Sequence, residues 1–143
     1  MTEQNETKTS RLLFWFRAAF VAYFIFSVYA LLSPRPTFGK VEIPTFSLLH
    51  AAAFSVLGAL AELARGKFPA VAAYTFLLIY GPLTEIIQPI TGRCFQWVDI
   101  LEDTVGIIAG VAAAWLLKLY LARREAKRQT DGKTACTAER EPK

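Results

Sequence analysis

Six polar side chains in the central part of the chain are of types that could do chemistry. They are His50, Glu85, Gln88, Arg93, Asp99 and Asp103. An imidazole or a carboxylate can transfer protons, and a carboxylate in an apolar environment holds its proton more tightly, so it can act near neutral pH. The planar guanidinium of arginine makes paired, charge-assisted hydrogen bonds to phosphate or carboxylate. These residues therefore allow either proton transfer or recognition of an anionic ligand.

The sequence contains no motif that assigns a catalytic mechanism. It has no GxSxG nucleophile motif, no glycine-rich phosphate loop and no metal-ligand spacing of cysteine and histidine. We accordingly expect no metal and no cofactor, and the motifs do not favour an enzyme.

The elements that must position these side chains are four long apolar segments. The 143 residues are 54% hydrophobic and 20% charged, which is too apolar for an ordinary soluble domain. The segments cover residues 12–32, 45–64, 68–88 and 100–122. Each is close to the roughly 20 residues that a helix needs to cross a bilayer. We predict an all-α polytopic membrane protein whose residues 12–122 form a bundle of four transmembrane helices; buried helices of a soluble protein are the alternative.

The basic residues predict the orientation of the bundle. If the N-terminus is cytoplasmic, ten Lys and Arg residues fall on or near the cytoplasmic side and three fall outside. This asymmetry follows the positive-inside rule, so residues 1–11 and 123–143 are predicted to be cytoplasmic tails. The second tail is basic and has too few large apolar residues to fold alone, so we expect it to be disordered. Residues 118–143 hold eight basic and four acidic residues, and their excess of four positive charges equals the net charge of +4 of the whole chain. Because the excess lies wholly in this segment, the net charge does not indicate a nucleic-acid partner.

Two questions of processing follow from this topology. The first segment could instead be a cleaved signal peptide, but its length and Arg17 within it favour a retained helix. Cys94 is expected outside and Cys136 inside, so the two cysteines are not expected to form a disulfide.

The depth of each polar residue predicts a cluster at the outer side of the membrane. At about 1.5 Å per residue, His50 lies about 9 Å from the outer end of its segment and Glu85 about 24 Å along an outward-running one. Asp99 caps the outer end of the last segment, and Asp103 lies about 6 Å below it. Arg93 is in the loop between these segments. The six residues therefore converge on a polar pocket open to the outside, and ionisable groups at such a depth are functional candidates.

Small residues share the faces that carry the acids. Gly106 and Gly110 form a GxxxG spacing on the stripe that carries Asp103, and Gly81 lies one turn below Glu85. This spacing lets another helix approach closely, either within the chain or in an oligomer.

A purely structural role is the alternative for several of these residues. Arg93 could clamp the loop by pairing with an acid, and Asp99 could serve only as a helix N-cap. Glu62 lies near the inner surface within i,i+3 reach of Arg65, which predicts a solvated ion pair.

The pattern over residues 85–110 resembles the signature of the VanZ-like family. The matching positions are Glu85, Gln88, Gly92, Arg93, Asp99, Asp103, Gly106 and Gly110. The spacing matches throughout, and the resemblance also covers His50 and Ser33-Pro34, so it extends over about residues 12–120. Phe46 and Ser47 depart from the Asp-Lys that the family often has before the histidine, and Asp103 replaces the usual Asn.

The resemblance implies a small multi-pass protein of the bacterial inner membrane with a role in the cell envelope. The family is named for a member linked to resistance to the glycopeptide teicoplanin, and this link transfers weakly to other members. With the lipid bilayer as its surroundings, the outer cluster would bind a lipid-linked or glycan head group. A membrane enzyme acting on such a substrate, with His50 or Glu85 as general base, is the first alternative. A small proton-coupled exporter is the second, although its acid should lie nearer the bilayer midplane.

Overall fold

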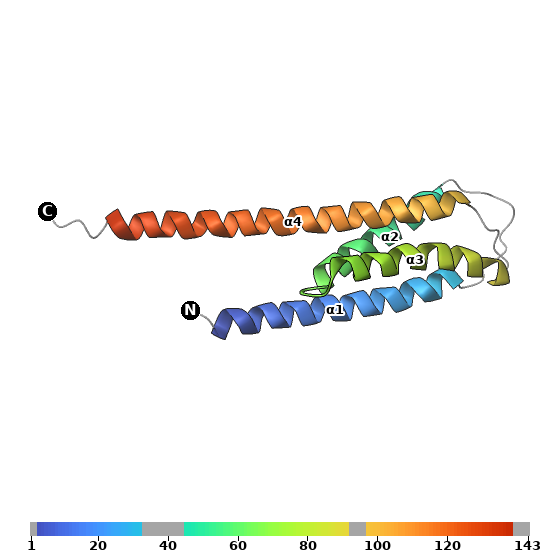
Figure 1. Cartoon of the computed structure of the whole chain (residues 1–143), viewed down its shortest axis with the longest axis horizontal. Helices are drawn as coiled ribbons and strands as arrows, with labels where there is room; N and C mark the ends of the chain where they lie inside the picture. The colour runs from blue at the N-terminus through green and yellow to red at the C-terminus, as the bar shows by residue number, and fades with distance from the viewer. Residues whose placement is uncertain (1–2, 33–44, 92–96, 139–143) are drawn as a thin grey trace.

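The chain folds into long α-helices. The computed structural model describes residues 3–32, 45–91 and 97–138, and these contain no β-strand. In chain order they form α1 (Glu3–Leu32), α2 (Thr45–Ala64), α3 (Ala70–Ile87), the short 3₁₀ helix η1 (Gln88–Thr91) and α4 (Trp97–Ala138), as Figure 1 shows. The predicted all-α fold is confirmed.

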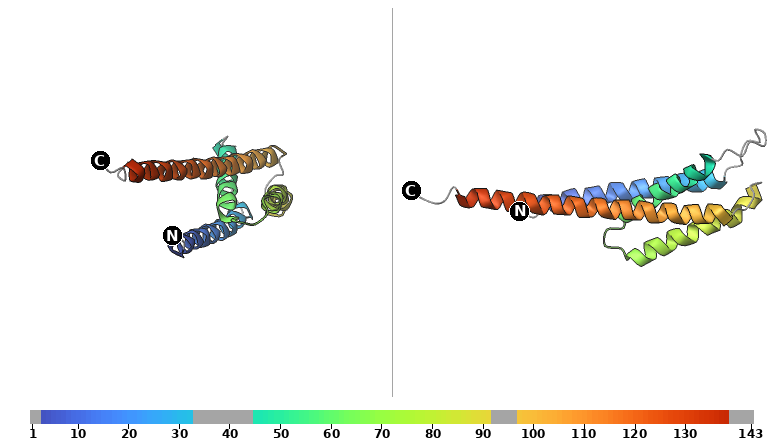
Figure 2. Two further views of the ribbon diagram at one scale, coloured as in Figure 1. Left: turned by 60° about the vertical axis from the view of Figure 1, so that its left-hand side comes forward. Right: turned by 90° about the horizontal axis from the view of Figure 1, so that it is seen from above.

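Successive helices run in opposite directions. α1 and α3 run one way along the bundle, and α2 and α4 run the other way (Figure 1). Both chain termini therefore lie toward the same end, and α4 continues far beyond the other helices at that end (Figures 1 and 2). The starts of α2 and α4 and the end of α3 lie together at the opposite end.

Three helices are long and apolar enough to cross a membrane. The qualifying spans are Thr9–Ala30, Ala70–Ile90 and Trp97–Gln129. The large apolar side chains on their outer faces are highly exposed, as for Val71 at 78%, an arrangement that water disfavours and lipid accommodates. The helices thus indicate a membrane protein. The apolar part of α2, His50–Ala64, is shorter, so a fourth span remains a prediction.

The closest helix pair is α2 and α4, and glycines make the approach possible. A Cβ added to Gly58 on α2 would lie 2.6 Å from the carbonyl oxygen of Ile107, and a Cβ on Gly106 or Gly110 would overlap the backbone carbonyl groups of Ala51 or Ser55. Only a hydrogen atom fits at these contacts, as in other close helix crossings. The face that the sequence offers to an oligomer is therefore covered by α2 of the same chain.

Aromatic and aliphatic side chains of all four helices fill the core. Phe54 and Leu57 of α2, Leu77 of α3 and Ile107 of α4 are each 3% exposed or less. The Tyr80 ring joins them, and α1 packs on this group through aromatic rings and through Ser27, whose Oγ is 2.9 Å from Tyr80 Oη. This core holds α3 and α1 against the α2–α4 pair.

The observed bounds differ from the predicted ones mainly at the chain ends. α1 begins at Glu3 and α4 remains helical to Ala138, whereas residues 1–11 and 123–143 are predicted as tails and the second as disordered. The extension of α4 is rich in Ala, Glu, Lys, Arg and Gln, which favour helix even without a packed face. Residues 33–44 and 92–96, which include Ser33-Pro34 and the Arg93–Cys94 pair, lie outside the described residues.

Candidate functional site

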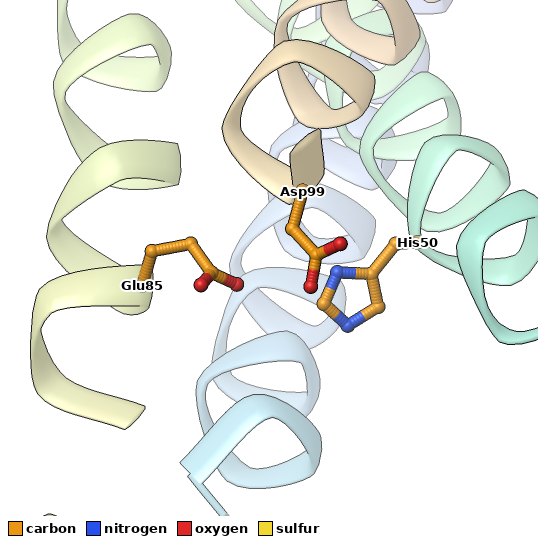
Figure 3. Close-up of side chains that lie close together, drawn as sticks. All are labelled: His50, Glu85 and Asp99. Carbon is orange, nitrogen blue, oxygen red and sulfur yellow. The ribbon is translucent and has the colours of Figure 1, made fainter. Parts of the chain in front are cut away.

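Three helices bring one imidazole and two carboxylates together at the end of the bundle away from the termini. His50 comes from α2, Glu85 from α3 and Asp99 from α4, and Figure 3 shows their side chains pointing toward one another. One ligand atom of each residue lies within 4.8 Å of the others. His50 and Glu85 are buried and Asp99 is partly buried. The convergence that the depths predict is therefore present for these three residues.

Asp103 extends this cluster into the bundle. It lies one helical turn beyond Asp99 on α4, and its Oδ1 is 3.6 Å from Nδ1 of His50. The residue is only 1% exposed, and neither of its carboxylate oxygens has a hydrogen-bond partner among the described residues. Since burying a carboxylate without hydrogen bonds is costly, its position calls for protonation or for a positively charged neighbour.

The glycines beside these residues set how near the helices come. Gly106 lies one turn below Asp103 and meets the backbone of Ala51, the residue next to His50. Gly81 faces Asp103 from α3, where a Cβ would lie 3.4 Å from Asp103 Cβ, an ordinary contact. The small residues therefore place His50 of α2 beside Asp103 of α4.

Gln88 and Arg93 complete the set of predicted site residues. Gln88 is 2% exposed at the start of η1, immediately after the helix that carries Glu85. Arg93 lies outside the described residues, so its predicted place in the site stays a prediction.

The cluster is acidic. Glu85, Asp99 and Asp103 bring three carboxyl groups to one imidazole, and every Lys and Arg among the described residues belongs to the part of the bundle toward the termini. Such a group can accept hydrogen bonds from hydroxyls, exchange protons or hold a cation. The absence of metal-ligand spacing in the sequence is no guide here, because the donors come from three different helices.

A second charged cluster lies at the other end of α2, and only its Glu62–Arg65 pair was predicted. Glu62 receives bonds from Arg65, Tyr74 and Lys118, including 2.9 Å from Lys118 Nζ to Oε1 and 2.5 Å from Tyr74 Oη to Oε2. The predicted Glu62–Arg65 pair is confirmed, but Glu62 is fully buried, so the prediction of a solvated pair is wrong.

The hydrogen bond to Glu62 raises the pKa of the Arg65 guanidinium above its ordinary value, so Arg65 stays charged. Lys118 comes from α4 and Tyr74 from α3, which local spacing cannot pair with Glu62. Their depth in the membrane could have indicated this contact, because Glu62, Tyr74 and Lys118 all lie near the same end of the helices. This cluster ties α2, α3 and α4 together.

The helices and their two polar clusters define the class: a helical membrane protein with a buried acidic site at one end. Comparisons with models of protein families, with curated proteins and with solved structures found no match. Its function is therefore argued from the site.

Proposed function

We propose that the chain is a VanZ-like multi-pass protein of the bacterial inner membrane that binds the polar head group of a lipid-linked or glycan envelope molecule. The observation that carries this proposal is the convergence of His50, Glu85 and Asp99 from three helices to within 4.8 Å. The residues that make this site are the ones on which the family resemblance rests.

The chemistry of the cluster suits a hydroxyl-rich ligand. Carboxylates accept hydrogen bonds from hydroxyl groups, and bonds to a charged acceptor are worth about 1.5–3 kcal/mol each. Asp99 is the member of the cluster that is partly exposed, so it is the group that a ligand meets first. In this proposal Arg93 binds the anionic part of the head group, since its guanidinium matches phosphate or carboxylate.

The location of the cluster suits a lipid-linked ligand. It lies at one end of helices that are long and apolar enough to cross a membrane, which is where lipid head groups are found. We propose four spans with both termini in the cytoplasm, which places the cluster on the outer side. The position of both termini at one end of the bundle and the excess of basic residues there support this orientation.

Binding measurements test the proposal. Full-length protein in lipid nanodiscs is titrated with a fluorescent lipid-linked glycan precursor, and Asp99→Asn and Arg93→Ala are compared with Glu125→Gln, an exposed acid on the far part of α4. Loss of one charge-assisted bond should weaken binding about tenfold or more in the first two variants. Glu125→Gln should bind like the parent. Affinity that is unchanged in Arg93→Ala removes the proposed anion contact, and absence of saturable binding by the parent removes the proposed function.

A membrane enzyme is the second candidate, and the contact between His50 and Asp103 favours it. A carboxylate beside an imidazole can orient it and stabilise its charged form, which suits a general base. The test is turnover of the same lipid-linked precursor by the purified protein. Turnover that persists in the double variant His50→Ala, Glu85→Gln excludes these residues as the bases.

A further inference from the structure

The donor atoms of His50, Glu85 and Asp99 lie close enough together to hold one metal ion. From this geometry we infer that His50, Glu85, Asp99 and Asp103 bind one divalent transition-metal ion, with Zn²⁺ as the expected occupant. The inference rests on the positions of these side chains and is independent of the proposed head-group ligand.

The separation of the donors fits one ion. Zn²⁺ binds nitrogen and oxygen ligands at about 2.0–2.2 Å, so two ligands of one ion lie between about 3 and 4.3 Å apart. The candidate atoms of His50, Glu85 and Asp99 all lie within 4.8 Å of one another. A side-chain adjustment of roughly 1 Å or less closes the remaining distance, and Glu85 has three side-chain torsions with which to make it.

Asp103 is a second, independent indication of a cation. Asp103 is only 1% exposed, and its two carboxylate oxygens have no hydrogen-bond partner among the described residues. Oδ1 lies 3.6 Å from His50 Nδ1, a separation typical of two ligands of one metal and long for a hydrogen bond. Asp103 is therefore a buried carboxylate beside the imidazole of the cluster, at a distance that a shared metal ion would account for.

A bound cation would also reduce the repulsion among the carboxylates of the cluster. Three carboxylates at one end of the bundle repel one another in a low-dielectric environment. The basic residues of the described chain lie toward the other end, where Glu62 already engages Arg65 and Lys118. A divalent ion would neutralise most of this charge and turn the repulsion into a bond between α2, α3 and α4.

The mixed donor set selects among metals. Imidazole suits Zn²⁺, Fe²⁺, Ni²⁺ and Cu²⁺, whereas an all-oxygen site suits Mg²⁺ and Ca²⁺. Imidazole nitrogen and carboxylate oxygen are both ligands of Zn²⁺, and the four side chains together would fill its usual tetrahedral set.

Metal binding by the purified chain tests the inference. Tag-free full-length protein in detergent micelles is stripped with a chelator and titrated calorimetrically with Zn²⁺ alone, with Mg²⁺ as the comparison ion. We expect one Zn²⁺ per chain, no binding of Mg²⁺ at matched concentration, and a rise in the unfolding temperature with Zn²⁺. His50→Ala and Asp103→Asn should each lower the Zn²⁺ affinity at least tenfold, while Glu125→Gln should keep it.

Two further measurements make every result decisive. If Asp103→Asn does not fold, as judged by circular dichroism and gel filtration, the partly exposed Asp99→Asn replaces it with the same expectation. Co²⁺ substitution gives a visible absorption spectrum that must change in His50→Ala if the imidazole is a ligand. No saturable Zn²⁺ binding, or equal binding by the parent, His50→Ala and the acid variant, overturns the inference. Because no lipid is added, this outcome is separate from failure of the head-group proposal.

Discussion

Replacing Gly58 by alanine is the sharpest test of how the helices that carry the site are held together. A Cβ at this position would lie 2.6 Å from the carbonyl oxygen of Ile107 and 3.1 Å from its Cα. Both are backbone atoms, so no side chain can turn away and α2 must move from α4 by about half an ångström or more. Overpacking of this kind costs about 1–3 kcal/mol.

Gly81→Ala is the matched control because it makes the same chemical change in a neighbouring helix. There the new Cβ would be 3.4 Å from Asp103 Cβ and 3.8 Å from the Phe54 ring, which are ordinary contacts. Both substitutions replace a buried helical glycine, and both gain about 1 kcal/mol of helix propensity. The difference between the two variants therefore isolates the cost of the clash.

The measurement is the free energy of unfolding of the full-length protein in dodecylmaltoside micelles, titrated with SDS and followed by tryptophan fluorescence. Gly58→Ala should be less stable than Gly81→Ala by about 1–3 kcal/mol. In a thermal scan this corresponds to a difference of roughly 3–12 °C for a chain of this size. Equal stability of the two variants, within about 0.5 kcal/mol, would refute the close backbone approach of α2 and α4.

Three further predictions test other parts of the molecule. Glu62→Gln removes the carboxylate that neutralises two basic side chains, so it should lower the unfolding free energy by about 2–4 kcal/mol in the same titration. Ser27→Ala and Tyr80→Phe, combined in a double-mutant cycle, should show a coupling of about 0.5–1.5 kcal/mol from the 2.9 Å hydrogen bond, and additive effects would exclude that bond. A membrane-impermeant maleimide should label Cys94 on intact cells and Cys136 only after permeabilisation, and the reverse pattern would contradict the proposed orientation.

The positions of the helices could be predicted from the sequence because their signal is local. The length of a membrane-spanning helix can be read from a run of about 20 apolar residues. Gly66 and Pro69 mark the turn between α2 and α3, where Gly66 has a φ of 55°. The helical end of α4 was not predicted. Residues 123–143 were expected to be disordered because they have too few large apolar residues to form a core. Helix propensity, which needs no core, is the property that decides this segment.

The partners within each cluster could be predicted only in part. Depth along a helix follows from residue count, so the gathering of His50, Glu85 and Asp99 at one end was predictable. Which atoms meet depends on how each helix is rotated and how closely it packs, and these are tertiary properties. For the same reason the i,i+3 pair of Glu62 and Arg65 was found while Lys118, 56 residues from Glu62, was not.

Glycine packing and the acidic site are parts of one arrangement, because the same stripe of α4 carries both. Gly106 rests on the backbone of Ala51, so the residues beside them, Asp103 and His50, cannot move apart unless this contact opens. At the far end Glu62 and Lys118 join the same two helices by an ion pair. The α2–α4 pair is thus fixed by the His50–Asp103 contact at one end, by the Glu62–Lys118 ion pair at the other, and by close glycine contacts between them. A GxxxG spacing usually read as an oligomer contact serves here to hold an imidazole against a buried carboxylate.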